Sequence, residues 1–138
     1  MRLILAAVDG SDPSRRAAQR AAEMAPRLGL GLRLATVIPD RAYFAEWQIG
    51  GDEGELHRLR EQDAHALLER IAAELPVAAE LRTLTGTPAE AIAEAAKADD
   101  VELVALGSRG RTLIGGVLIG SVAHRLVHIC AKPILIVH

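Results

Sequence analysis

Four small residues near the end of the chain have types and spacing that suit phosphate binding. Gly107 and Gly110 are followed by nine residues and then by Gly120 and Ser121, and the apolar run 101–106 precedes them. This pattern predicts a strand, a glycine-containing loop and a helix that begins at Gly120. The N-terminus of a helix attracts anions through its free N–H groups and its dipole, and glycine lets a ligand approach the backbone closely. The residues therefore predict a phosphate-binding loop, and a nucleotide is the expected ligand.

Other phosphate-binding motifs fit this loop less well. Gly115 and Gly120-Ser121 have the spacing of a P-loop, but no lysine precedes Ser121, so the usual contact to the β- and γ-phosphates is missing. No Gly-x-Gly-x-x-Gly follows the first strand, which argues against a dinucleotide site of the Rossmann kind. In a purely structural interpretation the glycines only allow the chain to turn between the strand and the helix. Gly110, however, is needed neither to end the strand nor to begin the helix.

Apolar runs that alternate with helical patterns predict the elements that position this loop. Strands are expected at 3–8, 32–38, 77–84, 101–106 and 133–137, and helices at 13–28, 56–75, 88–98 and 120–130. Asp12 is expected to cap the first helix, with Pro13 at its first position, and 87–90 to form a capping box. The apolar stripe of the first helix is expected to consist of Ala17, Ala21, Ala25 and Leu28.

Regular alternation of strands and helices predicts an α/β fold. We expect a doubly wound, five-stranded parallel sheet in the order 3-2-1-4-5, with helices on both faces as in flavodoxin- and Rossmann-like proteins. Such a sheet binds ligands at the carboxyl ends of its strands, where the strand order reverses. The turn at Asp9 and the glycine loop would then face each other. Because no internal repeat or linker divides the chain, residues 1–138 are expected to form one domain.

Composition narrows the class of protein. Half of the 138 residues are hydrophobic, a quarter are charged, and the formal net charge is -2. Without a basic block, general DNA or RNA binding is not expected, and without a long apolar segment neither is a membrane anchor. The run 1–8 is too short for the core of a signal peptide, and Cys130 has no second cysteine to pair with. A cytoplasmic location is the simplest expectation.

The glycine pattern resembles that of the universal stress protein family, whose nucleotide-binding members carry Gly-x2-Gly-x9-Gly-(Ser/Thr). The resemblance covers the whole chain: the segment from Val8 to Ser11 is similar to the end of the family's first strand, Val37 falls at the end of the second, and 132–137 is similar to the closing strand. It implies binding of ATP, or of ADP or AMP, with Mg²⁺ possible on the phosphates. It also implies a homodimer formed by antiparallel pairing of the strand at 133–137.

The resemblance also implies roles for individual residues. Gly110, Gly120, Ser121 and Val122 would offer backbone N–H groups to the phosphates. Gly107 would lie against the ribose, where a side chain would block the approach. Asp9 and Val37 would lie at the adenine, and Val8 is a further expected binding residue. Asp9 has a rival explanation as a residue of the turn before the helix. Arg109 and Arg111 would neutralise phosphate charge or remain solvated.

Two classes of function follow from this site. In the first, the protein binds ATP and serves as a nucleotide-dependent regulatory module in the stress response. In the second, the same site supports a slow ATPase or phosphotransferase. Efficient phosphoryl transfer requires positioned metal carboxylates and a group that orients the nucleophile, whereas Asp9 is the one clear carboxylate and no catalytic residue can be named. Binding is therefore favoured, and a stress-linked dimer without nucleotide is a third possibility.

Two further groups of residues are notable. The three aromatic residues of the chain, Tyr43, Phe44 and Trp47, fall within five residues after the second strand. They would form either a lid or contact segment near the nucleotide, or a small apolar cluster that holds a long loop. His124 and His128 are four residues apart on the last helix, but no glutamate lies between them, and a surface pair is expected rather than a metal site.

Overall fold

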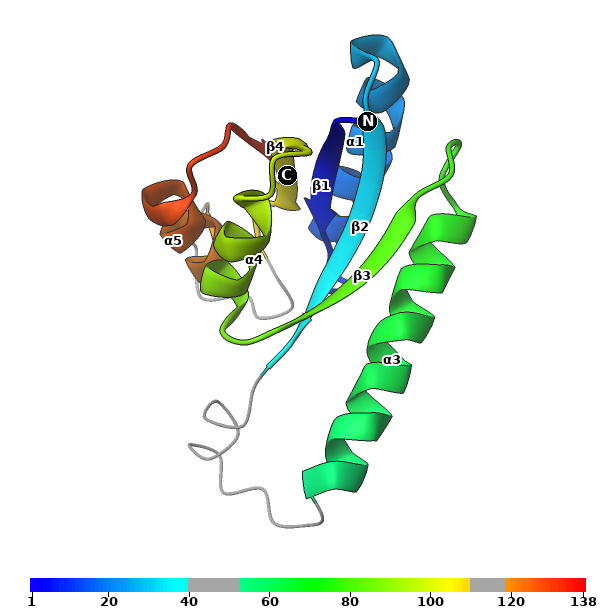
Figure 1. Cartoon of the computed structure of the whole chain (residues 1–138), viewed down its shortest axis with the longest axis vertical. Helices are drawn as coiled ribbons and strands as arrows, with labels where there is room; N and C mark the ends of the chain where they lie inside the picture. The colour runs from blue at the N-terminus through cyan, green and yellow to red at the C-terminus, as the bar shows by residue number, and fades with distance from the viewer. Residues whose placement is uncertain (40–52, 110–118) are drawn as a thin grey trace.

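The computed structural model describes residues 1–39, 53–109 and 119–138. Its elements, in chain order, are β1 (Leu3–Ala7), α1 (Asp12–Leu28), β2 (Gly31–Ile38), α3 (Glu53–Ala73), β3 (Glu80–Thr85), α4 (Pro88–Ala96), β4 (Val101–Gly107), α5 (Ser121–Ile129) and β5 (Ile134–Val137). All neighbouring strands are parallel, in the order β3-β2-β1-β4-β5 (Figure 1). The predicted sheet and its strand order are therefore confirmed.

Each face of the sheet has its own apolar core. On one face α1 and α3 cover alternate residues of the strands, including Ile4 and Leu34. On the other face α4 and α5 cover the intervening residues, including Leu5 and Val104. β1 is buried along its whole length because it lies in the middle of both cores. The central strands therefore consist of continuous apolar runs, as expected for a sheet covered on both faces.

Helix α1 begins one position earlier than the sequence predicts. Ser11, not Asp12, is the N-cap: its backbone is extended and its side chain accepts a hydrogen bond from the N–H of Ser14. The helix ends at Gly29, which has the positive φ of 69° that glycine adopts easily. Of the predicted stripe, the three alanines are buried but Leu28 is 54% exposed, so the buried stripe ends one turn before the helix does.

Two other local predictions need correction. The third strand spans Glu80–Thr85 rather than 77–84, because its register is set by pairing with β2 from Arg33↔Glu80 to Ile38↔Thr85. Thr87 is the N-cap of α4 and Pro88 its first residue, but the Thr87 side chain forms no capping hydrogen bond. Proline at the first position has no N–H, so the first turn has one unpaired donor fewer.

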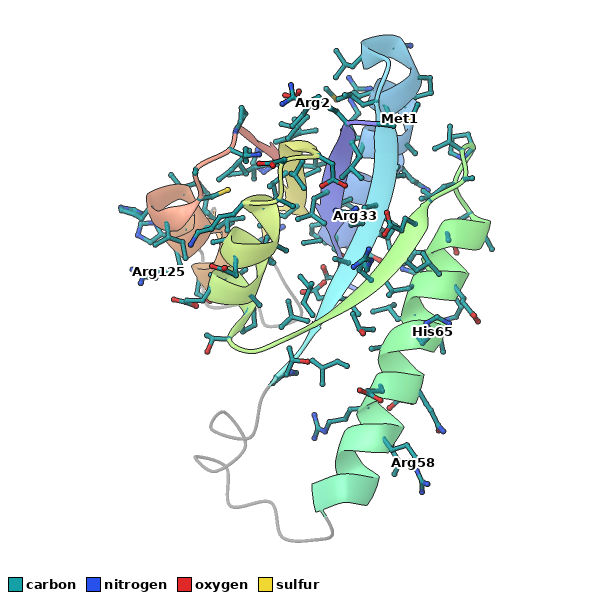
Figure 2. The ribbon with its side chains drawn as sticks, in the orientation of Figure 1. Met1, Arg2, Arg33, Arg58, His65 and Arg125 are labelled. Carbon is teal, nitrogen blue, oxygen red and sulfur yellow. The ribbon has the colours of Figure 1, made fainter. Side chains whose placement is uncertain are left out.

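Ion pairs join elements at the rim of the molecule. Arg33 on β2 contacts Asp100, which precedes β4, at 2.8 Å and Glu80 on β3 at 3.0 Å (Figure 2). Its hydrogen bonds hold the pKa of both carboxyl groups below their ordinary values. Between the two helices of one face, Arg125 of α5 contacts Glu90 of α4 at 3.0 Å. In the described residues, the helices are too short or too polar to span a membrane.

Candidate functional site

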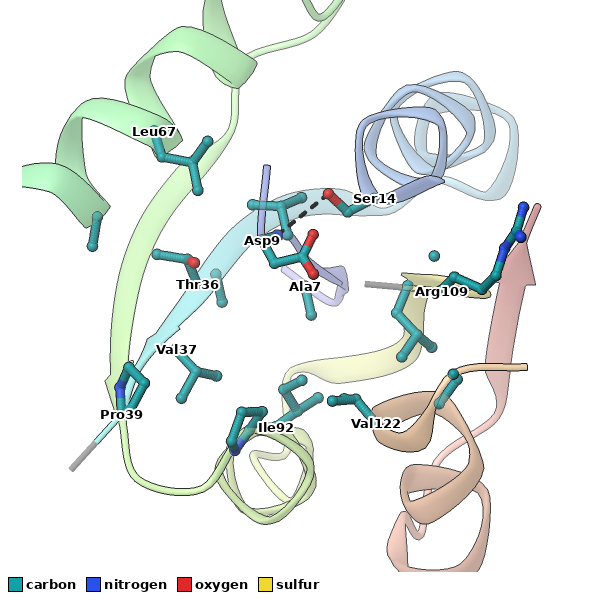
Figure 3. A pocket seen from close by; sticks show the side chains of 18 of the residues that line it. Ala7, Asp9, Ser14, Thr36, Val37, Pro39, Leu67, Ile92, Arg109 and Val122 are labelled. Carbon is teal, nitrogen blue, oxygen red and sulfur yellow. Dashed lines mark hydrogen bonds between the residues drawn. The ribbon is translucent and has the colours of Figure 1, made fainter. Parts of the chain in front are cut away.

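A cavity of about 1240 Å³ lies at the carboxyl ends of the central strands (Figure 3). Small-molecule sites occupy roughly 300–1,000 Å³, so a nucleotide would fit. The predicted residues that line the cavity are Val8, Asp9, Val37, Gly107, Arg109, Gly120, Ser121 and Val122. Gly110 and Arg111 lie outside the described residues, as do the three aromatic residues at 43–47. The topology thus brings together residues that are more than 100 positions apart in the chain.

The turn between β1 and α1 is held by a local network of hydrogen bonds. The carboxylate Oδ1 of Asp9 accepts one bond from the N–H of Ser11 at 2.9 Å and another from its hydroxyl at 2.5 Å. The Ser14 hydroxyl donates to the carbonyl of Ser11 at 2.9 Å and accepts from the N–H of Asp9 at 3.3 Å. Asp9 therefore organises the start of α1. Its second oxygen, Oδ2, takes no part in this network.

The start of α5 offers unpaired backbone donors to the cavity. Gly120 is the N-cap, with extended backbone at φ -70° and ψ 165°, and its N–H donates to the carbonyl of Ser108. The N–H groups that follow, on Ser121 and Val122, belong to the first turn, where no carbonyl four residues earlier is in helical position. Within the described part of the chain they have no hydrogen-bond partner. The positive end of α5 thus faces the cavity, whereas that of α1 is capped by a serine.

Packing against α1 requires glycine at position 107, which also lines the cavity. A Cβ at this position would lie 2.7 Å from the backbone carbon of Pro13 and 2.7 Å from the nitrogen of Ser14. The end of β4 therefore passes directly against the first turn of α1, and any side chain would separate them. The sequence suggested that a ligand needs this glycine, but the contact with α1 requires it whether or not a ligand is bound.

Arg109 lines the cavity through its position at the end of β4. Its side chain is exposed and extends toward β5, away from Asp9 and Val37 (Figure 3). Its carbonyl accepts a hydrogen bond from the Ser11 hydroxyl at 3.5 Å, so Arg109 is linked to the α1 turn. In this conformation the guanidinium is solvated, which is one of the two roles that the sequence left open.

The structure adds residues that the sequence did not single out. Thr36 on β2 and Ile92 on α4 line the cavity, as do Asp63, Leu67 and Arg70 on α3. The spacing of the three α3 residues is that of one helix face. Nothing in their sequence shows, however, that this face lies beside the end of β2. Thr36 lies within a mostly apolar strand, where it and Arg33 are the polar residues.

The two histidines of α5 form an exposed pair. Both side chains are exposed, their ring centroids are 4.9 Å apart, and His128 Nδ1 lies 2.9 Å from the carbonyl of His124. His124 also lines the cavity. Among the described residues, no three His, Cys, Asp or Glu side chains are grouped closely enough to hold a metal ion.

Comparison with known proteins agrees with this architecture. The model of the universal stress protein family matches residues 1–138. A universal stress protein of Mycolicibacterium smegmatis is 35% identical over 133 residues, which cover 92% of this chain and 91% of that protein. The solved structure of the hypothetical protein MJ0577 is 25% identical, with a TM-score of 0.83 and coverage of 99% of this chain and 94% of the other. A universal stress protein solved in complex with cAMP is also 25% identical, with a TM-score of 0.73 and coverage of 99% and 97%. The chain therefore belongs to the universal stress protein family.

Proposed function

We propose that the cavity at the carboxyl ends of β1, β2 and β4 binds an adenine nucleotide, with ATP as the principal ligand and ADP or AMP as alternatives. The observation that carries the proposal is the position of α5: its unpaired first-turn N–H groups face a cavity of nucleotide size at the point where the strand order reverses. The cAMP complex of a structurally similar relative supports adenine as the base.

The proposed ligand lies across the ends of three strands. Its phosphates contact the N–H groups of Ser121 and Val122 and the Ser121 hydroxyl at the start of α5. The sugar lies over the end of β1 and beside Gly107, within reach of the free Oδ2 of Asp9. The base reaches Val37 at the end of β2. Gly110 and Arg109 contribute to the phosphate end, and Mg²⁺, where present, is held by the phosphates rather than by a protein cage.

The charges around the cavity favour binding over hydrolysis. Among the described lining residues, the acidic side chains are Asp9 and Asp63, and Asp9 already uses one oxygen in the α1 turn. Fast phosphoryl transfer needs carboxylates that hold a metal, a cation on the transferred phosphate and a group that orients the nucleophile. We therefore propose a nucleotide-dependent regulatory role in the cytoplasm, in which the bound ligand sets the surface that the protein presents to partners.

A homodimer through 133–137 is part of the proposal. In the described part of the chain, β5 is the last strand of the sheet and pairs with β4 alone. Its four residues are half-buried, and an open apolar edge is a template for pairing with another strand. Sedimentation at micromolar concentration would show a mass twice that of the chain, and a purely monomeric species would contradict dimerisation without affecting the nucleotide site.

Replacement of Ser121 by proline tests the nucleotide site directly. Proline suits the first position of a helix and removes its N–H, and the extended backbone of Gly120 is the conformation that a residue before proline requires. We expect Ser121→Pro to weaken ATP binding at least tenfold by calorimetry while leaving the helical signal and the urea midpoint unchanged. Ser121→Ala, which removes the hydroxyl and keeps the N–H, should weaken binding by a smaller factor.

Three results would contradict parts of this proposal. Absence of ATP, ADP and AMP binding to the unaltered protein would refute the nucleotide site. Equal ATP affinity of Ser121→Pro and the unaltered protein would refute the role of α5. Phosphate release from ATP that disappears in Ser121→Pro would show that the protein is a hydrolase and would overturn the purely regulatory interpretation.

A further inference from the structure

We infer that Thr36 determines recognition of the nucleotide base, by accepting a hydrogen bond from the exocyclic amine of adenine; the inference rests on the proposed nucleotide site. Thr36 lies in the middle of the sheet, on β2, and is only 6% exposed. It lines the cavity together with Leu67 of α3 and Asp9, and Figure 3 shows its side chain below that of Leu67.

Thr36 is a largely buried residue whose hydroxyl remains accessible from the cavity. Three polar residues are buried in the described chain, namely Ser14, Thr36 and Ser108. The hydroxyl of Ser14 has partners in the α1 turn. Ser108 also lines the cavity, but its hydroxyl oxygen is itself fully buried and has no partner in the described chain. No described residue forms a hydrogen bond with the Thr36 hydroxyl. Because Thr36 lines the cavity, a ligand bound there can supply the missing hydrogen-bond partner.

The strand order places the far end of the ligand at Thr36. The proposed phosphate site follows β4, Asp9 follows β1, and Thr36 is near the end of β2. Strands are about 4.8 Å apart, so β2 lies roughly 10 Å from β4. A nucleotide that spans this distance has its base at β2. In adenine the exocyclic amine lies on the side of the ring system remote from the sugar, and it therefore projects farthest from the phosphate site.

The surroundings of Thr36 suit a purine ring. Its side chain is on the α3-facing side of the sheet, the same side as Leu34 and Val8. Leu67 on α3 is 7% exposed and also lines the cavity, so it offers an apolar surface to the face of a ring. A hydroxyl carries one donor and two acceptor lone pairs, which lets it accept from the amine and donate to a neighbouring ring nitrogen.

The test pairs Thr36→Val with a ligand that lacks the amine. Valine keeps the shape of threonine and removes only the hydroxyl. We expect the unaltered protein to bind ATP about three- to tenfold more tightly than purine riboside triphosphate, which has hydrogen in place of the amine. We expect Thr36→Val to bind the two ligands equally. This loss of discrimination is the signature of a direct contact between the two groups.

Thr83→Val is the matched control. Thr83 lies directly opposite Thr36 in the β2–β3 register but is exposed and does not line the cavity. It should leave both affinities unchanged. Thr36→Val should also unfold at a urea concentration no lower than that of the unaltered protein, because its hydroxyl has no partner to lose.

Different results would refute the proposed nucleotide site and the role of Thr36. Failure of the unaltered protein to bind ATP would refute the proposed function itself. Binding of ATP with equal discrimination in Thr36→Val and the unaltered protein would refute only the inference on Thr36. A lower urea midpoint for Thr36→Val, with discrimination retained, would show a structural role and would also overturn it.

Discussion

Alanine at position 107 is expected to destabilise the protein even in the absence of any ligand. The added Cβ would lie 2.7 Å from two backbone atoms of the first turn of α1, which is 0.7 Å inside the 3.4 Å at which ordinary contacts begin. Neither atom belongs to a flexible side chain, and the turn is held by the hydrogen bonds of Asp9, Ser11 and Ser14. Either β4 or α1 must therefore shift. Overpacking of this kind costs about 1–3 kcal/mol, and we expect about 2–3 kcal/mol.

Urea unfolding of the ligand-free protein measures this cost. With a slope of about 2 kcal/mol per molar urea, Gly107→Ala should lower the midpoint by about 1 M. Gly31→Ala is the control, because the nearest atom to its new Cβ is the sulfur of Met1 at 3.3 Å, and Met1 is 94% exposed and free to move. That variant should remain within about 0.5 kcal/mol of the unaltered protein.

The stability of Gly107→Ala distinguishes two reasons why position 107 is a glycine. If Gly107 serves only to let a ligand approach, the ligand-free variant will be as stable as the unaltered protein, and the packing argument is refuted. If Gly31→Ala loses as much free energy as Gly107→Ala, the loss reflects a general intolerance of alanine in these strands rather than the contact with α1.

Two other predictions concern the α1 cap and the rim ion pairs. Ser11→Ala removes the acceptor for the Ser14 N–H and should lower the unfolding free energy by about 1 kcal/mol, measured by urea titration. Arg33→Met removes the hydrogen bonds that lower the pKa of Glu80 and Asp100. Because these carboxyl pKa values are lower in the folded than in the unfolded state, the stabilisation by Arg33 is fully present above the ordinary value of about 4 and is lost as pH falls through the lowered values. The stability difference between the two proteins should therefore shrink between pH 5 and pH 2 in urea titrations, and a constant difference would contradict the assignment.

The apolar runs predicted the strands well where both faces are covered. The expected strand at 101–106 is observed as Val101–Gly107, and that at 32–38 as Gly31–Ile38. The edge strand β3 was predicted less accurately because its residues are mostly exposed and its limits depend on the partner strand. The cap of α1 was misassigned for a related reason. Asp and Ser are equally good caps, and the choice depends on which side chain the turn leaves free.

The candidate site was predicted in its outline and not in its contacts. Gly107 and Gly120 were identified as site residues from spacing alone, but the first contacts α1 and the second donates its N–H to Ser108. The partner of Gly107 is in α1, far away in the chain, and that of Gly120 is Ser108, twelve residues earlier. A local sequence pattern therefore cannot predict either contact. Thr36 was missed because a single threonine in a strand is unremarkable until the fold places it in the lining of the cavity with no described partner for its hydroxyl.

By itself the sequence determined the family, the order of strands and helices, and the residues gathered at the carboxyl edge of the sheet. These follow from periodicity and from glycine spacing, which are local properties of the chain. Only the tertiary structure decided which backbone groups remain free to bind a ligand. The N–H groups at the start of α5 are unpaired and those of α1 are capped, because hydrogen bonding depends on which distant atoms the fold brings within reach.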